Sequence, residues 1–165
     1  SNSSAASDVY KRQKTGTEQE IREELARLTA ARFLSPRQAE AVDTGSILRL
    51  FSSPLGRRIM SADARKREFK FSLLCPAEKF FPGGEGESVL MQGVIDCMIE
   101  EAGELTIIDY KTDRVRGEET AERAQTYSKQ LEAYAYAAQR MTGKPVRECV
   151  LYFLYSGETV KSSCK

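Results

Sequence analysis

Two apolar runs, residues 89–100 and 105–111, flank the short segment Glu101-Ala102-Gly103-Glu104. Both runs are rich in valine, isoleucine and leucine, and their length suits strands. A two-residue hairpin turn needs positive φ angles, which glycine adopts without strain. The pattern therefore predicts an antiparallel hairpin with Ala102 and Gly103 as its two loop residues.

This hairpin would bring three charged side chains together. If Ala102 and Gly103 form the loop, Asp96 lies directly opposite Asp109, and the Cβ atoms of such a pair are about 5 Å apart. Lys111 is two residues beyond Asp109, so the alternation of side chains along a strand places it on the same face. A slip of one residue would separate the aspartates onto opposite faces.

Facing carboxylates in apolar strands repel each other and are poorly solvated, and a divalent cation offsets both effects. Two carboxylates and several waters commonly hold Mg²⁺ where phosphate groups are processed. Lys111 could then orient an attacking water or stabilise the pentacovalent phosphate. Alternatively, Lys111 only neutralises the aspartates of a surface hairpin. We favour a magnesium-dependent nuclease site at Asp96, Asp109 and Lys111, because clustered, partly buried ionisable groups tend to mark function.

The rest of the chain predicts an α/β fold with a helical first third, followed by strands, a helix and a strand. Capping signals and spacing predict short helices between Thr17 and Ala62. Alternation predicts a strand over Arg67–Leu73, and Pro76–Gly86 is expected to be a loop. One helix is expected over Glu118–Met141, before a fully buried strand over Cys149–Tyr155.

Composition narrows the class of protein. The 165 residues suit a single domain, 41% are hydrophobic, and the net charge is +1. No run is long and apolar enough to cross a membrane, so no membrane partner is expected. DNA contacts would have to come from local clusters, each of which solvated surface charge explains as readily. These clusters are Arg57-Arg58, Arg65-Lys66-Arg67 and Arg114/Arg116/Arg123.

The sequence has no histidine, and its four cysteines are scattered. A zinc site, an iron–sulfur cluster and a histidine base are therefore not expected. Cys75, Cys97 and Cys149 lie in or beside apolar runs and are expected to be buried. Carboxylates, lysine and a hard metal ion remain as the groups for any chemistry.

Residues 1–13 are small and polar and show no periodicity, so we expect residues 1–16 to be a disordered leader or an artefact. The string over residues 8–13 resembles the translation of a transposon sequencing adapter. The native protein is then expected to begin near Lys14 and to be truncated, with the domain over 17–165.

Asp96 followed by Asp109-Tyr110-Lys111 resembles the D…(D/E)-x-K motif of the restriction-endonuclease-like, or PD-(D/E)XK, nucleases. Together with residues 92–95 and 112–115, it is similar to the RecB-type nuclease domain that ends the AddA component of bacterial AddAB (RexAB) helicase–nucleases. The resemblance extends from about Thr17 to Val160. It includes residues 53–56, 67–69 and 150–153.

The resemblance implies roles for particular residues. Asp96, Asp109 and the Tyr110 backbone carbonyl would bind Mg²⁺, with Mn²⁺ as an alternative, and Lys111 would be the catalytic lysine. Glu68 matches an accessory acidic position, although an exposed strand glutamate explains it about as well. Gln130 and Tyr134 match the Q-x-x-x-Y motif and lie on one helix face, where they would support the site or contact DNA.

The implied function is a Mg²⁺-dependent DNA exonuclease domain that processes double-strand breaks for recombinational repair. The implied partners are DNA, the helicase domains of the same parent chain and the AddB (RexB) component. The implied location is the bacterial cytoplasm, at the nucleoid. The family's histidine ligand is missing, and truncation is the expected reason. Two alternatives stay open: a stand-alone Cas4-like or phage-type exonuclease, and a catalytically impaired DNA-binding or partner-docking module.

Overall fold

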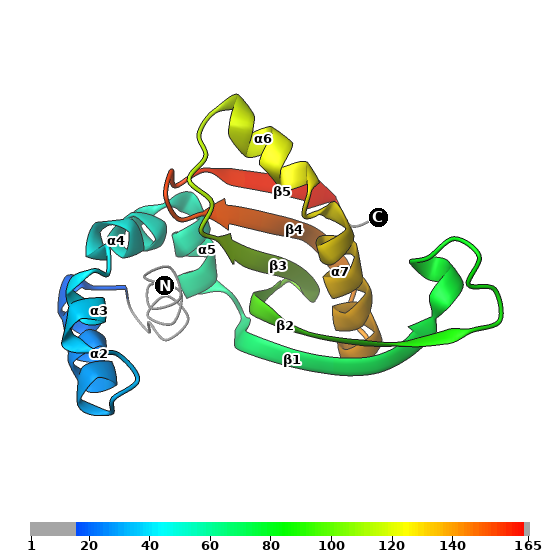
Figure 1. Cartoon of the computed structure of the whole chain (residues 1–165), viewed down its shortest axis with the longest axis horizontal. Coiled ribbons are helices and arrows are strands. Elements are labelled where there is room, and N and C mark those ends of the chain that lie inside the picture. Colours follow the sequence, from blue (N-terminus) through cyan, green and yellow to red (C-terminus); the bar gives the residue numbers. More distant parts are fainter. Residues whose placement is uncertain (1–15, 164–165) are drawn as a thin grey trace.

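A five-stranded mixed sheet organises the computed structural model, which describes residues 16–163 (Figure 1). The strands lie in the order β1-β2-β3-β4-β5, and only β3 and β4 are parallel neighbours. Their bounds are β1 (Ala64–Pro76), β2 (Ser88–Glu101), β3 (Glu104–Lys111), β4 (Val146–Phe153) and β5 (Thr159–Ser163). The expected α/β class and mixed sheet are confirmed. Within the described residues, no helix is long and apolar enough to span a membrane.

Within residues 16–163, four short helices precede the sheet, as expected. They are α2 (Glu18–Ala30), α3 (Pro36–Glu40), α4 (Thr44–Ser52) and α5 (Pro54–Ser61). Thr17 caps α2, as expected, by accepting a hydrogen bond from the Glu20 backbone N–H, and Ser35 forms a capping box with Gln38 at the start of α3. The helices that follow β3 are α6 (Glu118–Gln125) and α7 (Ser128–Thr142).

Each face of the sheet has its own hydrophobic core. One core joins α2, α4 and α5 to the side of the sheet that carries Cys97, Ile108 and Tyr152. The other core joins α6 and α7 to the opposite side, where Ile107 and Phe153 lie. Residues of β3 therefore alternate between two buried layers, which explains why the strand is apolar along most of its length.

The hairpin turn has the geometry that the sequence predicts. Ala102 and Gly103 both have positive φ, 52° and 83°, as a two-residue hairpin turn of the primed type requires. The ladder pairs Cys97 with Ile108 and Glu101 with Glu104. The predicted register is confirmed, and extending it by one pair places Asp96 opposite Asp109.

Strand β2 changes the phase of its pleat close to Asp96. Ile95 and Met98 belong to the same core although they are three residues apart, whereas regular alternation would send them to opposite faces. Across the ladder in β1, Glu68 has a φ of 50°, which is unfavourable for a residue other than glycine. Such strained positions tend to lie at functional sites.

An ion-pair cluster fixes α5 against the turn end of the hairpin. The Arg58 guanidinium contacts Glu101 at 2.6 Å and Glu148 at 2.8 Å, and it also donates to the Thr106 hydroxyl. These contacts raise the pKa of Arg58 above its usual value. Arg58 thus holds a helix, the hairpin turn and strand β4 together.

The expectation of a single helix over Glu118–Met141 is wrong. The Thr126 hydroxyl donates to the Arg123 carbonyl, and the backbone N–H groups of Thr126 and Tyr127 bond three residues back rather than four. Side chains that compete for helix carbonyls in this way favour helix ends. The chain therefore leaves α6 at Gln125 and begins α7 at Ser128.

Other differences are smaller. Strand β1 extends beyond the expected Arg67–Leu73 at both ends, and the expected loop after it contains the short 3₁₀ helix η1 (Ala77–Lys79). Strand β5 was not expected, because its residues are mostly polar. Cys75, Cys97 and Cys149 are buried as expected, and burial raises the pKa of Cys97 to about 11. Of the expected leader, residues 1–16, residues 1–15 lie outside the described part of the chain.

The corner between α4 and α5 should depend on Gly56. A Cβ at this position would clash with the Leu50 carbonyl oxygen and lie 2.6 Å from the Phe51 Cα, both of them backbone atoms. Overpacking of this kind costs about 1–3 kcal/mol, so we expect Gly56→Ala to lower the free energy of unfolding by about 2 kcal/mol. The measurement is urea denaturation followed by circular dichroism.

Gly45→Ala is the matched control, because a Cβ there would approach only the Asp43 side chain, at 3.2 Å. Alanine is favoured over glycine in a helix, so this substitution should be neutral or slightly stabilising. Equal stability of the two variants would contradict the close approach at Gly56.

Candidate active site

The two aspartates lie where the pairing of β2 with β3 ends. Asp109 on β3 is only 4% exposed, whereas Asp96 on β2 is half-buried. The Tyr110 backbone N–H donates to Asp96 Oδ2 at 2.9 Å, so the Asp96 side chain bonds to the neighbouring strand beyond the last ladder pair. This bond orients the Asp96 carboxylate along β3, beside Asp109.

Lys111 has three partners at the end of β3. Its Nζ lies 2.6 Å from Asp109 Oδ2 and donates to Gln130 Oε1 at 2.8 Å. The same ammonium lies 3.7 Å from the centre of the Tyr127 ring, which is a cation–π contact. The lysine side chain is only 12% exposed, so these contacts replace most of its hydration.

Helix α7 supplies the groups that hold Lys111. Gln130 Nε2 donates to the Tyr134 hydroxyl at 3.0 Å, so the amide links the lysine to the tyrosine one turn later. Burial raises the pKa of Tyr134 above its usual value, as do the charges of Asp109 and Asp96, whereas the bond from Gln130 lowers it. Both residues of the expected Q-x-x-x-Y pair are therefore beside the carboxylates.

Tyr127 and Asp113 also belong to this charged cluster, and neither was expected as a site residue. The Tyr127 hydroxyl donates to Asp113 Oδ2 at 2.8 Å, and Asp113 also contacts Arg123 at 3.4 Å. Burial, together with Asp113, raises the pKa of Tyr127 to about 12. In the sequence Tyr127 lies one turn before Gln130. Its ring reaches the Lys111 ammonium because Tyr127 lies at the break between α6 and α7.

Glu68 is the expected site residue that the structure does not bring into the cluster. It lies across the ladder from Asp96 but is exposed, and within residues 16–163 no group of three carboxylate, cysteine or histidine side chains could hold a metal ion. Asp96, Asp109 and the Tyr110 carbonyl offer only hard oxygen donors. This set fits Mg²⁺ or Mn²⁺, since Mg²⁺ often takes one or two protein carboxylates and completes its shell with water and phosphate.

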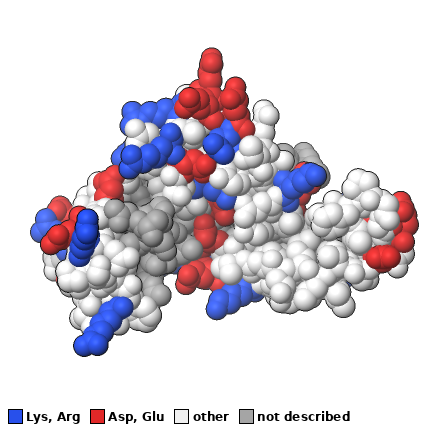
Figure 2. Space-filling view, in the orientation of Figure 1, with Lys and Arg blue, Asp and Glu red and all other residues white. Residues whose placement is uncertain are grey.

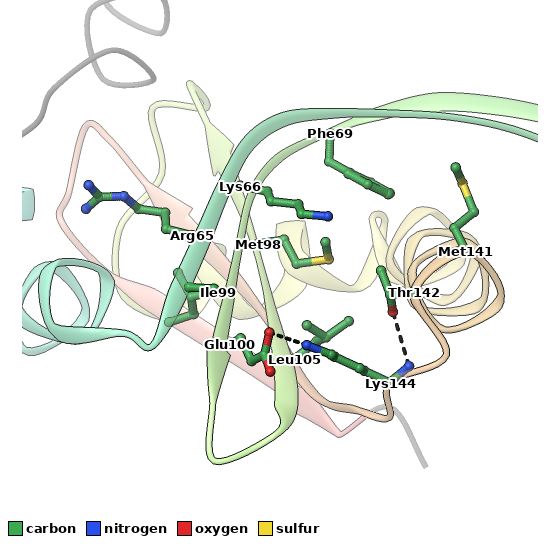
Figure 3. A pocket seen from close by; sticks show the side chains of 11 residues that line it. Arg65, Lys66, Phe69, Met98, Ile99, Glu100, Leu105, Met141, Thr142 and Lys144 are labelled. Carbon is green, nitrogen blue, oxygen red and sulfur yellow. Dashed lines mark hydrogen bonds and ion pairs between the residues drawn. The ribbon is translucent and has the colours of Figure 1, made fainter.

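A pocket of about 400 Å³ lies on the α7 side of the hairpin, towards its turn (Figure 3). Phe69, Met98 and Met141 line it, and Lys144 and Glu100 pair at its rim at 2.5 Å. Asp96, Asp109 and Lys111 are not among its lining residues. The pocket is therefore separate from the charged cluster, which lies at the other end of β3.

Comparisons with known proteins agree with this architecture. The family model of the PD-(D/E)XK nuclease superfamily matches residues 4–163. The chain is 38% identical over 155 residues to the A subunit of an ATP-dependent helicase/nuclease from Bacillus cereus (strain Q1), covering 88% of this chain. It is 39% identical over 140 residues to the protein of the same name from Desulforudis audaxviator, covering 83% of this chain.

The chain spans 12% of the length of the Bacillus relative and 11% of that of the Desulforudis relative. A solved structure titled "Crystal structure of SSO0001" aligns with 95% of this chain and 64% of its own, at 15% identity and a TM-score of 0.41, which is too distant to carry weight. The family match covers nearly all of the chain and includes the Asp96, Asp109 and Lys111 cluster. The chain therefore belongs to the PD-(D/E)XK nuclease superfamily.

Proposed function

We propose that this chain is a DNA nuclease domain that hydrolyses phosphodiester bonds with Mg²⁺ at Asp96, Asp109 and Lys111. The observation that carries the proposal is the buried Asp109 carboxylate, 2.6 Å from Lys111 Nζ and beside Asp96. Nucleases of this superfamily generally use divalent metal ions. The charged cluster supplies hard oxygen ligands and a cation in one place, which is what phosphate chemistry needs.

In this proposal Asp96, Asp109 and the Tyr110 carbonyl hold the cation. The bound cation would activate water and stabilise negative charge on the phosphate. Asp96 is kept in place by the Tyr110 N–H, and Asp109 is kept in place by its strand and by Lys111. Two protein carboxylates rather than one would favour a divalent ion over a monovalent one.

Lys111 places a positive charge beside the scissile phosphate. Its ammonium donates to Gln130 and contacts Tyr127, so its direction is set by α7 as well as by β3. An ammonium held in this way can orient an attacking water or stabilise the phosphorane without reorganising during the reaction. Gln130 and Tyr134 are positioning residues for Lys111. Glu68 would be an accessory acidic residue, and it could approach the metal site only if its exposed side chain turned towards Asp96.

We propose that the domain, residues 17–165, belongs to a helicase–nuclease protein of the AddA type. The two helicase/nuclease relatives are about eight times longer than this chain, so the helicase domains would lie elsewhere in a parent chain. The partners would be DNA and an AddB (RexB) protein. The role would be exonucleolytic processing of double-strand-break ends for recombination in the bacterial cytoplasm.

A second candidate is a DNA-binding or docking module whose catalysis is impaired. The observation that favours it is the lack of a third metal-binding side chain in the part of the chain that the structure describes. The retained contact between Asp109 and Lys111 argues against it, because two ionised groups this poorly hydrated are costly to keep without a function. Metal binding and cleavage distinguish the two candidates.

Asp109→Asn and Lys111→Gln should each abolish cleavage of DNA in Mg²⁺ or Mn²⁺, with losses of at least about 100-fold, because each removes a charge that acts on the transition state. The measurement is release of labelled product from an oligonucleotide, with circular dichroism to verify folding. Lys161→Gln on the exposed part of β5 is the control and should retain activity. Cleavage undiminished in both site variants would refute the assignment.

Metal binding should stabilise the folded chain. At a metal concentration 100 times the dissociation constant, binding to the native state alone adds about 2.7 kcal/mol to the free energy of unfolding. We therefore expect millimolar Mg²⁺ or Mn²⁺ to raise the melting temperature of the unaltered chain and to leave that of Asp109→Asn almost unchanged. No shift in the unaltered chain would favour the docking module.

Gln130→Met should slow cleavage about tenfold or more while changing stability little. Methionine keeps the volume of the side chain but cannot accept the hydrogen bond from Lys111, so the ammonium loses its orientation. Gln139→Met, an exposed position of the same helix, is the matched control. Equal cleavage rates for the two variants would show that Gln130 does not position Lys111.

A further inference from the structure

A second cationic cluster lies beside the end of β3, outside the proposed cleavage site. The guanidinium groups of Arg114 and Arg116 lie over the ring of Tyr155, with Cζ atoms 5.5 Å and 4.7 Å from the ring centre. Arg49 on α4 donates to the Tyr155 carbonyl at 3.3 Å. Figure 2 shows Lys and Arg side chains gathered beside the β3–α6 loop and the β4–β5 turn.

Acidic side chains lie beside this cluster in Figure 2, but they do not neutralise Arg114 and Arg116 by direct contact in the described part of the chain. Within residues 16–163, neither Arg114 nor Arg116 forms an ion pair with a carboxylate. Glu158 accepts hydrogen bonds from the Thr120 hydroxyl and the Gly117 N–H, and these bonds, with a smaller contribution from Arg116, lower the pKa of Glu158. Guanidinium groups of like charge around one tyrosine repel each other, and a bound anion would relieve that repulsion.

The cluster adjoins the strand end that carries Lys111. The Leu154 N–H donates to the Lys111 carbonyl at 2.9 Å, and Tyr155 is the next residue along the chain. Neighbouring β-strands are about 4.8 Å apart, so the backbone of Tyr155 starts close to Lys111. The next nucleotide of a DNA strand bound at Lys111 would therefore be within reach of the tyrosine. The loop with Arg114 and Arg116 leaves the same end of β3, as Figure 1 shows.

The chemistry of the cluster matches a nucleotide with an unpaired base. Guanidinium groups bind phosphate oxygens through paired hydrogen bonds. Tyr155 is 40% exposed, and its ring could stack on a base of any sequence once bound phosphates draw Arg114 and Arg116 off the ring. Bases in a duplex are already stacked on their neighbours, so the ring would select a single strand.

We propose that Arg114, Arg116 and Tyr155 form a subsite for single-stranded DNA, which binds the nucleotide next to the scissile phosphate. This inference rests on the proposed nuclease function and adds the form of its substrate. The arginines bind the phosphates on either side of that nucleotide, and the tyrosine stacks on its base. Arg49 supports Tyr155 from the other side through the backbone.

The test measures binding without cleavage. A fluorescent oligothymidine is titrated with the chain in EDTA, at several salt concentrations, and fluorescence anisotropy reports the dissociation constant. Arg114→Ala combined with Arg116→Ala should weaken binding about tenfold at low salt. It should also reduce the slope of log K against log salt by about 1.4, which corresponds to two phosphate contacts of a single strand.

Arg37→Ala combined with Arg140→Ala is the charge-matched control, because both side chains are exposed on helices away from the cluster. The control pair should change neither the affinity at moderate salt nor the salt slope appreciably. An equal loss in both double variants would mean that only net charge matters and would overturn the subsite. Failure of the unaltered chain to bind the oligonucleotide at low salt would overturn it as well.

Tyr155 gives an independent readout. Tyr155→Phe keeps the ring and should bind oligothymidine like the unaltered chain, whereas Tyr155→Leu should weaken binding about tenfold. Neither should alter binding of a blunt duplex. A loss in Tyr155→Phe equal to that in Tyr155→Leu would overturn the stacking role. If the arginine variants lose binding while Asp109→Asn still cleaves, the proposed catalytic site fails, and only the binding of single strands by Arg114, Arg116 and Tyr155 stands.

Discussion

The register of the β2–β3 hairpin is the constraint on which the charged cluster depends. The positive φ angles of Ala102 and Gly103 set the loop length, and the loop length sets which residues face each other. A one-residue slip would turn Asp96 to the other face of the sheet, where the core of α2, α4 and α5 lies. The apolar residues on both faces of β2 and β3 oppose such a slip, so the packing of two cores also fixes the geometry of two carboxylates.

The buried Asp109 then accounts for much of what α7 does. A carboxylate that is 4% exposed needs a compensating charge, and Lys111 provides it. The ammonium in turn needs partners, which are the Gln130 amide and the Tyr127 ring. The break between α6 and α7 places that ring against the Lys111 ammonium, so the break is part of the geometry of the charged cluster.

Local patterns predicted the hairpin, its register, the α/β class and the buried β4 strand, because each follows from spacing and turn chemistry. Three features could not be read in this way. Helix α6 ends at Gln125 because the bond from the Thr126 hydroxyl to the Arg123 carbonyl prevails over a good helix-forming composition. The polar strand β5 exists only because β4 offers it an edge. The strained backbone of Glu68 depends on the change of pleat shared by β1 and β2, which no single strand's pattern reveals.

A net charge of +1 gives the chain no general attraction for DNA, so the DNA binding that we propose must come from local groups of positive charge. Strand β3 and the loop after it carry Asp109, Lys111, Arg114 and Arg116 in succession. Because these groups share one strand and one loop, a displacement of β3 would move the proposed metal ligands and the proposed phosphate contacts together. In the proposed function, substrate binding and cleavage geometry are therefore coupled through a single element, whose position is fixed by β2 on one side and by β4 on the other.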